Sequence, residues 1–128
     1  MQRQLTLRPD DTLAMNNLAF ALAETGTDLD QAQSLAEKAQ RKEPNNPGIA
    51  DTLGWVYAKK GLSDSAAQIY QNLVRKYPND PAFRYHYGVA LLQQGKRAEA
   101  RTQFDLSLSN KPPKDIAEKI KEIVNRMG

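Results

Sequence analysis

Apolar and charged residues alternate along the end of the chain with the period of an amphipathic helix. Ile116, Ile120, Ile123 and Val124 fall on one helical face, and charged residues fall on the other. Gly, Pro, Asn and Asp break the remaining sequence into segments of helical length. The pattern predicts seven helices, over 12–25, 29–43, 47–60, 63–76, 81–94, 97–110 and 114–127.

Residues at the predicted helix ends support these boundaries. Asn46-Pro47 and Asp80-Pro81 each place a capping side chain before a proline at the first helical position. Three glycines stand where the first helix of a pair must stop and the chain must turn, a position suited to positive φ. They are Gly26, Gly61 and Gly95.

Small and large residues recur along the chain at a fixed spacing. Gly54, Gly61, Ala66, Tyr70 and Pro78 return 34 residues later as Gly88, Gly95, Ala100, Phe104 and Pro112. One step earlier stand Ala19, Gly26, Ala32 and Pro44, with one extra residue in the loop 27–30. The small residues allow two helices to approach closely, and the large ones fill the space between them.

The enlarged loop contains Asp28 and Asp30. Acidic residues are favoured at the start of a helix, so we expect both to cap the helix that follows.

This period and punctuation resemble the tetratricopeptide repeat, a helix–turn–helix unit. The resemblance implies an all-α, right-handed α-solenoid of three units, 12–46, 47–80 and 81–114. Residues 115–128 are expected to form a C-terminal capping helix near the natural end of the parent chain. Residues 1–11 are expected to be the remnant of a preceding repeat, with Leu5 and Leu7 on a severed apolar edge. The runs 16–20 and 51–55 also resemble those of bacterial members of the family.

The resemblance implies that the first helix of each unit lines a concave face. Phe20, Trp55 and Val89 each lie about 200° from the residue that packs inside their own unit. This row and its neighbours one turn away give the predicted ligand-binding groove: Asn16, Phe20, Asp51, Trp55, Lys59, Tyr85, Val89 and Leu92. Two interpretations of the aromatic row remain open, contact with a ligand and packing against the next repeat, because a tryptophan ring can do both.

The predicted ligand is an apolar or aromatic peptide, or an amphipathic helix. Relatives that bind chaperone tails clamp a terminal carboxylate with Lys, Asn and Arg side chains. The corresponding positions here are Asn16, Phe20, Thr52, Ala82 and His86. No Lys or Arg stands among them, so a heat-shock chaperone tail is not the expected ligand.

Composition argues against catalysis and nucleic-acid binding. The chain has no cysteine and one histidine, which excludes thiolate nucleophiles, cysteine zinc sites and histidine pairs. His86 is expected to be a partly exposed surface residue. No nucleophile motif or phosphate loop is present, so no enzyme activity, metal or cofactor is predicted. Basic residues alternate with acidic ones and the net charge is only +3, so no nucleic-acid partner is predicted.

The sequence therefore predicts a protein–protein interaction scaffold that binds a protein or peptide in its concave groove. The alternative is a structural module that self-associates through the edges of its repeats. No apolar run approaches the length of a membrane span, and the first residues lack the apolar core of a signal peptide. A cytoplasmic and a bacterial periplasmic location both fit.

Overall fold

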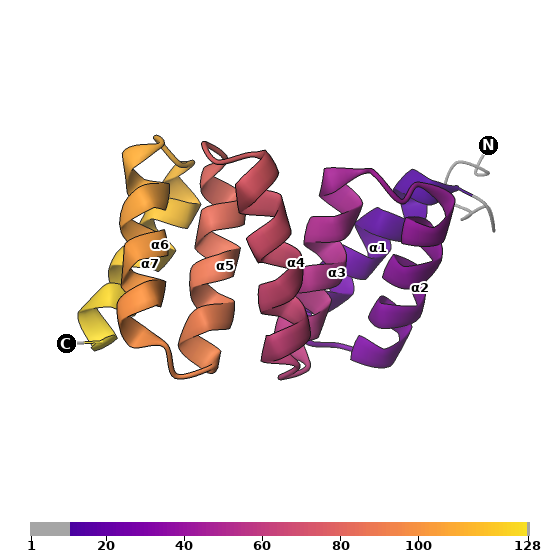
Figure 1. Cartoon of the computed structure of the whole chain (residues 1–128). Helices are drawn as coiled ribbons and strands as arrows, with labels where there is room; N and C mark the ends of the chain where they lie inside the picture. The colour runs from indigo at the N-terminus through magenta and orange to yellow at the C-terminus, as the bar shows by residue number, and fades with distance from the viewer. Residues whose placement is uncertain (1–10, 128) are drawn as a thin grey trace.

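The computed structural model describes residues 11–127, which form seven α-helices and no strands (Figure 1). The helices are α1 (Thr12–Thr25), α2 (Leu29–Lys42), α3 (Pro47–Lys59), α4 (Ser63–Lys76), α5 (Pro81–Gln93), α6 (Arg97–Ser109) and α7 (Lys114–Met127). The predicted all-α architecture is confirmed. Four helices end one residue earlier than predicted, because their last predicted residues are C-caps: Glu43, Lys60, Gln94 and Asn110.

Side chains at the predicted N-caps satisfy the free amides of the helix starts. The Asn46 side chain accepts hydrogen bonds from the amides of Gly48 and Ile49, at 2.9 and 3.3 Å. The Asp80 side chain accepts one from the amide of Phe83, at 3.1 Å. These bonds confirm that each predicted Asn-Pro or Asp-Pro pair begins a helix.

The turns inside the hairpins have the predicted backbone. Gly26, Gly61 and Gly95 have φ values of 73°, 82° and 84°, the left-handed region that favours glycine. Asp28, in the enlarged loop, caps α2 by accepting from the amide of Gln31. The expected role of Asp28 is therefore confirmed.

The helices pair as three hairpins, α1–α2, α3–α4 and α5–α6, stacked side by side with α7 at the end (Figure 1). The first helices of the hairpins also contact one another in succession, α1 with α3 and α3 with α5, and α5 then contacts α7. One surface of the stack is therefore built by α1, α3, α5 and α7. The boundaries of the three sequence units remain predictions.

Each hairpin crosses where a small residue faces its partner helix. A Cβ on Gly54 would lie 2.8 Å from the ring of Tyr70, and the same atom on Gly88 would collide with the ring of Phe104. In the first hairpin the equivalent positions are Ala19 and Ala36, which are both buried in one cluster. A glycine thus faces an aromatic ring in the second and third hairpins, and two alanines meet in the first.

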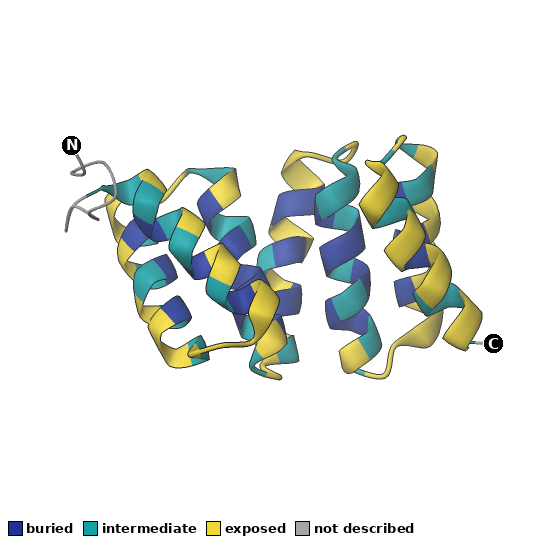
Figure 2. Ribbon diagram, turned by 180° about the vertical axis from the view of Figure 1, so that it is seen from behind, coloured by how far each residue is buried: buried dark blue, intermediate teal, exposed yellow. Residues whose placement is uncertain are grey.

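Helix α7 covers the last hairpin with its apolar face. Ile120 is fully buried, and Ile116, Ile123, Val124 and Met127 pack against the same core. The guanidinium of Arg97 donates a hydrogen bond to the carbonyl of Met127. Figure 2 shows buried residues on the helix faces that meet other helices and exposed residues on the outside.

Leu5, Leu7 and nearly all of the predicted remnant 1–11 lie outside the described residues. Within residues 11–127, no helix has the length and apolar character that crossing a membrane requires.

Candidate functional site

An open hollow of about 330 Å³ lies where α1, α3, α5 and α7 come together. We call it the first-helix hollow. Its lining comes from α1, α3, α5 and α7: Glu24, Trp55, Lys59, Tyr85, Val89, Lys119, Glu122 and Ile123. Four of the eight predicted groove residues therefore line one hollow, and they are Trp55, Lys59, Tyr85 and Val89.

Trp55 forms the floor of the first-helix hollow and is only 5% exposed. Its Nε1 donates a hydrogen bond to Oε1 of Glu24 on α1, at 3.1 Å. The Lys59 Nζ lies 5.1 Å from the centre of the indole ring, in the geometry of a cation–π contact. Of the two interpretations left open by the sequence, packing between repeats accounts for the burial of this ring, which contacts Tyr85 and His86 of α5.

Three other predicted groove residues lie elsewhere. Phe20 is 37% exposed on α1 and does not line the first-helix hollow. Leu92 is partly buried and packs against the main core. Asn16 lines a separate hollow near the start of α1, and its Oδ1 is buried without a hydrogen-bond partner among the described residues. These three residues therefore lie outside the first-helix hollow.

Asp51 is committed to contacts inside the protein. Its Oδ1 accepts a hydrogen bond from the Tyr70 hydroxyl at 2.8 Å and lies 2.7 Å from Nδ1 of His86. The same hydroxyl also lies 2.7 Å from the Asp51 backbone carbonyl. The Asp51 carboxylate thus joins α3 to α4 and α5.

The expectation that His86 lies at the surface is wrong. The residue is 7% exposed, and its ring centroid lies 4.3 Å from that of Trp55 and 5.2 Å from that of Tyr85. Its ring lies against Trp55 and Asp51 of α3 and Tyr70 of α4. These residues belong to the preceding hairpin, and the sequence pattern of α5 does not show that they cover His86.

Burial and nearby carboxylates raise the pKa of two tyrosines, Tyr85 and Tyr70. Burial raises the pKa of Tyr85 to about 12, with further contributions from the carboxylates of Glu24, Asp115 and Glu122. Burial also raises the pKa of Tyr70 well above its usual value, and the charge of Asp51 adds to the effect. Both phenols are therefore neutral at physiological pH.

Sequence reasoning missed the contribution of α7 to the first-helix hollow. The 34-residue step that relates Gly54 to Gly88 also leads from Tyr85 to Lys119 and from Val89 to Ile123. Helix α7 thus continues the register of the first helices, and this spacing could have identified both residues.

The first-helix hollow has the chemistry of a non-covalent binding surface. Its lining combines four apolar or aromatic side chains with two lysines and two glutamates. No group of three or more His, Cys, Asp or Glu side chains within residues 11–127 is placed to hold a metal ion.

Sequence comparisons give three matches. The tetratricopeptide repeat family model matches residues 52–115, which are 64 of the 128 residues. A TPR repeat-containing protein of Pseudomonas aeruginosa is 31% identical over 71 residues, which are 56% of this chain and 12% of that protein. Human aspartyl/asparaginyl beta-hydroxylase is 35% identical over 57 residues, 44% of this chain and 8% of that protein. The chain thus spans about an eighth or less of these two relatives.

Solved structures share the fold over nearly the whole chain. The type III secretion translocator chaperone SycD of Yersinia enterocolitica superposes with a TM-score of 0.76 at 22% identity, covering 93% of this chain and 92% of that one. A structure of MamA superposes with a TM-score of 0.69 at 25% identity, covering 98% of this chain and 73% of that one.

Proposed function

Because this chain belongs to the tetratricopeptide repeat family, we propose that it is a non-catalytic protein-interaction scaffold that binds a peptide or a partner helix in the first-helix hollow. One observation carries the proposal: side chains of α1, α3, α5 and α7 converge on a single hollow that is lined by both apolar and charged residues. Helices that meet in this way form a recurrent setting for peptide recognition.

The lining of the first-helix hollow favours an apolar or aromatic anchor with charged neighbours. Val89 and Ile123 are partly exposed and line the hollow together with the more deeply buried Trp55 and Tyr85. Lys59 and Lys119 suit acidic groups of the ligand, and the glutamates on the rim suit basic groups. Binding energy in such interfaces concentrates in a few large anchors.

The proposal is tested by capture of partners from cells of the source organism. The bait is the wild-type chain or one of two variants that alter the hollow, Val89→Glu and Lys59→Glu. Val89→Glu places a charge on the apolar wall, and Lys59→Glu reverses a rim charge. The matched control is Lys38→Glu, which makes the same charge change at an exposed position on α2 outside the hollow.

We expect a partner that is captured by the wild type and by Lys38→Glu and is lost with both hollow variants. Equal capture by all four baits would contradict a binding role for the first-helix hollow. Circular dichroism of each bait confirms that the helices are retained.

Self-association is the second candidate function. Leu13 and Phe20 are exposed large apolar residues on α1, the first helix of the described stack. Exposed apolar surface at the end of a repeat array favours contact with another repeat. In this case α1 forms the interface, and the first-helix hollow has no role in it.

A further inference from the structure

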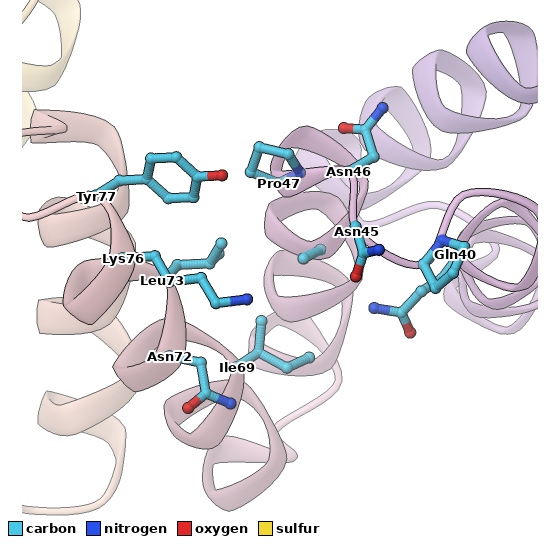
Figure 3. A pocket seen from close by; sticks show the side chains of 11 residues that line it. Gln40, Asn45, Asn46, Pro47, Ile69, Asn72, Leu73, Lys76 and Tyr77 are labelled. Atoms are coloured by element: carbon cyan, nitrogen blue, oxygen red, sulfur yellow. The ribbon is translucent and has the colours of Figure 1, made fainter.

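A second hollow, of about 140 Å³, lies between the α2–α3 connection and the C-terminal half of α4. We call it the junction hollow. Figure 3 shows side chains of α4 on one side of it and side chains of the α2–α3 connection on the other. Its lining is Gln40, Pro44, Asn45, Asn46, Pro47, Ala50, Ile69, Asn72, Leu73, Lys76 and Tyr77, none of which lines the first-helix hollow.

The equivalent place one repeat later is filled by an arginine. The 34-residue step leads from Ala50 to Arg84 and from Ile69 to Gln103. The Nη1 of Arg84 donates to Oε1 of Gln103 at 2.9 Å, and its Nε donates to the Pro78 carbonyl at 3.1 Å. At the first junction the methyl group of Ala50 leaves this space open.

A second polar contact of the later junction, between a serine and a proline carbonyl, has no counterpart at the first junction. Ser107 is fully buried, and its hydroxyl donates to the Pro81 carbonyl at 2.7 Å. The 34-residue step places Leu73 and Pro47 at the corresponding positions. The junction hollow therefore results from particular residues of this sequence, and the fold itself does not require it.

The junction hollow has the size and lining to hold one apolar side chain. Ala50, Ile69 and Leu73 give it an apolar floor. A cavity of about 150 Å³ with an apolar lining is enough to bind benzene. Neutral carboxamides at the rim, such as Gln40 and Asn45, both donate and accept hydrogen bonds, as a peptide backbone requires.

Most charges beside the junction hollow are basic; the exception is the Glu43 carboxylate, which accepts a hydrogen bond from the Asn46 side chain at 2.9 Å. Lys76 is the one charged residue in its lining. Helix α4, which supplies four lining residues, ends in the exposed basic pair Arg75-Lys76, and α2, which supplies Gln40, ends in the exposed pair Arg41-Lys42. An acidic segment therefore complements this surface, and a basic one does not.

We propose that the junction hollow is a second docking site, which takes one leucine- or phenylalanine-sized side chain from an acidic segment of a partner protein. Gln40 and Asn45 hydrogen-bond the backbone of that segment, and Lys76 pairs with an acidic side chain beside the anchor. This site is independent of the binding proposed for the first-helix hollow.

The test is a titration of the ¹⁵N-labelled chain, followed by NMR, with a synthetic acidic pentapeptide that has a central leucine between glutamates. Two comparison peptides replace the leucine by alanine or the glutamates by lysines. We expect amide shift changes confined to residues 40–50 and 69–77 with the acidic leucine peptide. The two comparison peptides should bind roughly tenfold more weakly or worse, a change of about 1.4 kcal/mol.

The chain itself supplies the variants. The double variant Ala50→Arg with Ile69→Gln gives the first junction the two residue types that fill the second junction. It should therefore abolish the shift changes. Its added positive charge would by itself attract the acidic peptide, so a loss of binding reports filling of the hollow. The matched control Arg84→Ala opens the second junction and should leave binding at the first unchanged. Lys76→Glu, at an exposed position, should weaken binding without relying on the fold of the double variant.

Three outcomes would overturn the proposal. The first is no shift change at the junction hollow with the acidic leucine peptide. The second is equal binding of the peptides, or binding that persists in the double variant and in Lys76→Glu. The third is a wild-type dimer in sedimentation that becomes a monomer in the double variant, which would assign the hollow to a second copy of the chain.

Discussion

The indole ring of Trp55 lies against the imidazole of His86, with centroids 4.3 Å apart and planes inclined by 35°. This contact joins α3 to α5, and Oδ1 of Asp51, also on α3, lies 2.7 Å from Nδ1 of the same imidazole. The floor of the first-helix hollow is therefore also part of the interface between the second and third hairpins. Substitutions at Trp55 should therefore change stability, so Lys59 and Val89 give the cleaner test of the proposed binding.

Trp55→Ala should destabilise the fold, because it removes a large buried ring from between two hairpins. The expected cost is about 3–5 kcal/mol, as for other buried aromatic truncations. Phe20→Ala is the matched control, since Phe20 occupies the same repeat position and is 37% exposed. Thermal unfolding followed by circular dichroism measures both. Equal melting temperatures for Trp55→Ala and the wild type would contradict the packing described here.

Asp51→Ala should destabilise the chain by leaving buried His86 without its carboxylate partner. Removing one partner of a buried hydrogen bond typically costs about 1–3 kcal/mol. Asp30→Ala is the control, because Asp30 forms an exposed ion pair with Lys60 and such pairs contribute little. Urea unfolding of both variants is the measurement. A cost for Asp51→Ala no larger than that for Asp30→Ala would be inconsistent with a structural role for the carboxylate.

Stability should fall in alkaline solution as tyrosines in the unfolded chain ionise. The usual tyrosine pKa is about 10, and burial raises the pKa of Tyr85 in the folded chain to about 12. Above the lower value the unfolded chain loses this proton while the folded chain keeps it, so stability decreases with rising pH. The contribution is fully present below about pH 10 and is lost between the two values. Tyr85→Phe should flatten this part of a curve of unfolding free energy against pH, and an unchanged curve would contradict it.

Gly88→Ala should destabilise the third hairpin, because a Cβ there would lie 2.7 Å from Cδ1 of Phe104. Overpacking of this kind typically costs about 1–3 kcal/mol, and Gly88→Leu should cost more. The double variant with Phe104→Ala copies the Ala19 and Ala36 pair of the first hairpin and removes the clash. Its total cost should therefore be smaller than the sum of the two single costs in denaturant unfolding. Strict additivity would show that the two positions do not touch.

If the exposed apolar residues of α1 form an interface, the chain should self-associate. Sedimentation over a concentration series should then detect a dimer or larger species, and Leu13→Glu with Phe20→Glu should return it to a monomer. Lys38→Glu, on the exposed face of α2, serves as the control. A wild-type chain that stays monomeric at high concentration would remove self-association through α1.

The sequence alone determined the helices, their turns and their pairing within hairpins. These features depend on neighbours close in the chain or at a fixed repeat spacing: Asn46 and Asp80 at helix starts, Gly61 and Gly95 in turns, and Gly88 opposite Phe104. The 34-residue spacing carries the last relationship because it repeats the same crossing in successive units.

The tertiary structure decided how far each groove position is exposed. Phe20, Trp55 and Val89 share one repeat position, yet Phe20 is exposed, Trp55 is buried and Val89 lies between. A helical period gives the direction of a side chain relative to its own helix. What fills that direction depends on the adjacent hairpin: His86 and Tyr85 cover Trp55, and Ile123 of α7 lies beside Val89 in the hollow. Burial is a property of the surrounding side chains, so the position of a residue within its own repeat could not determine it.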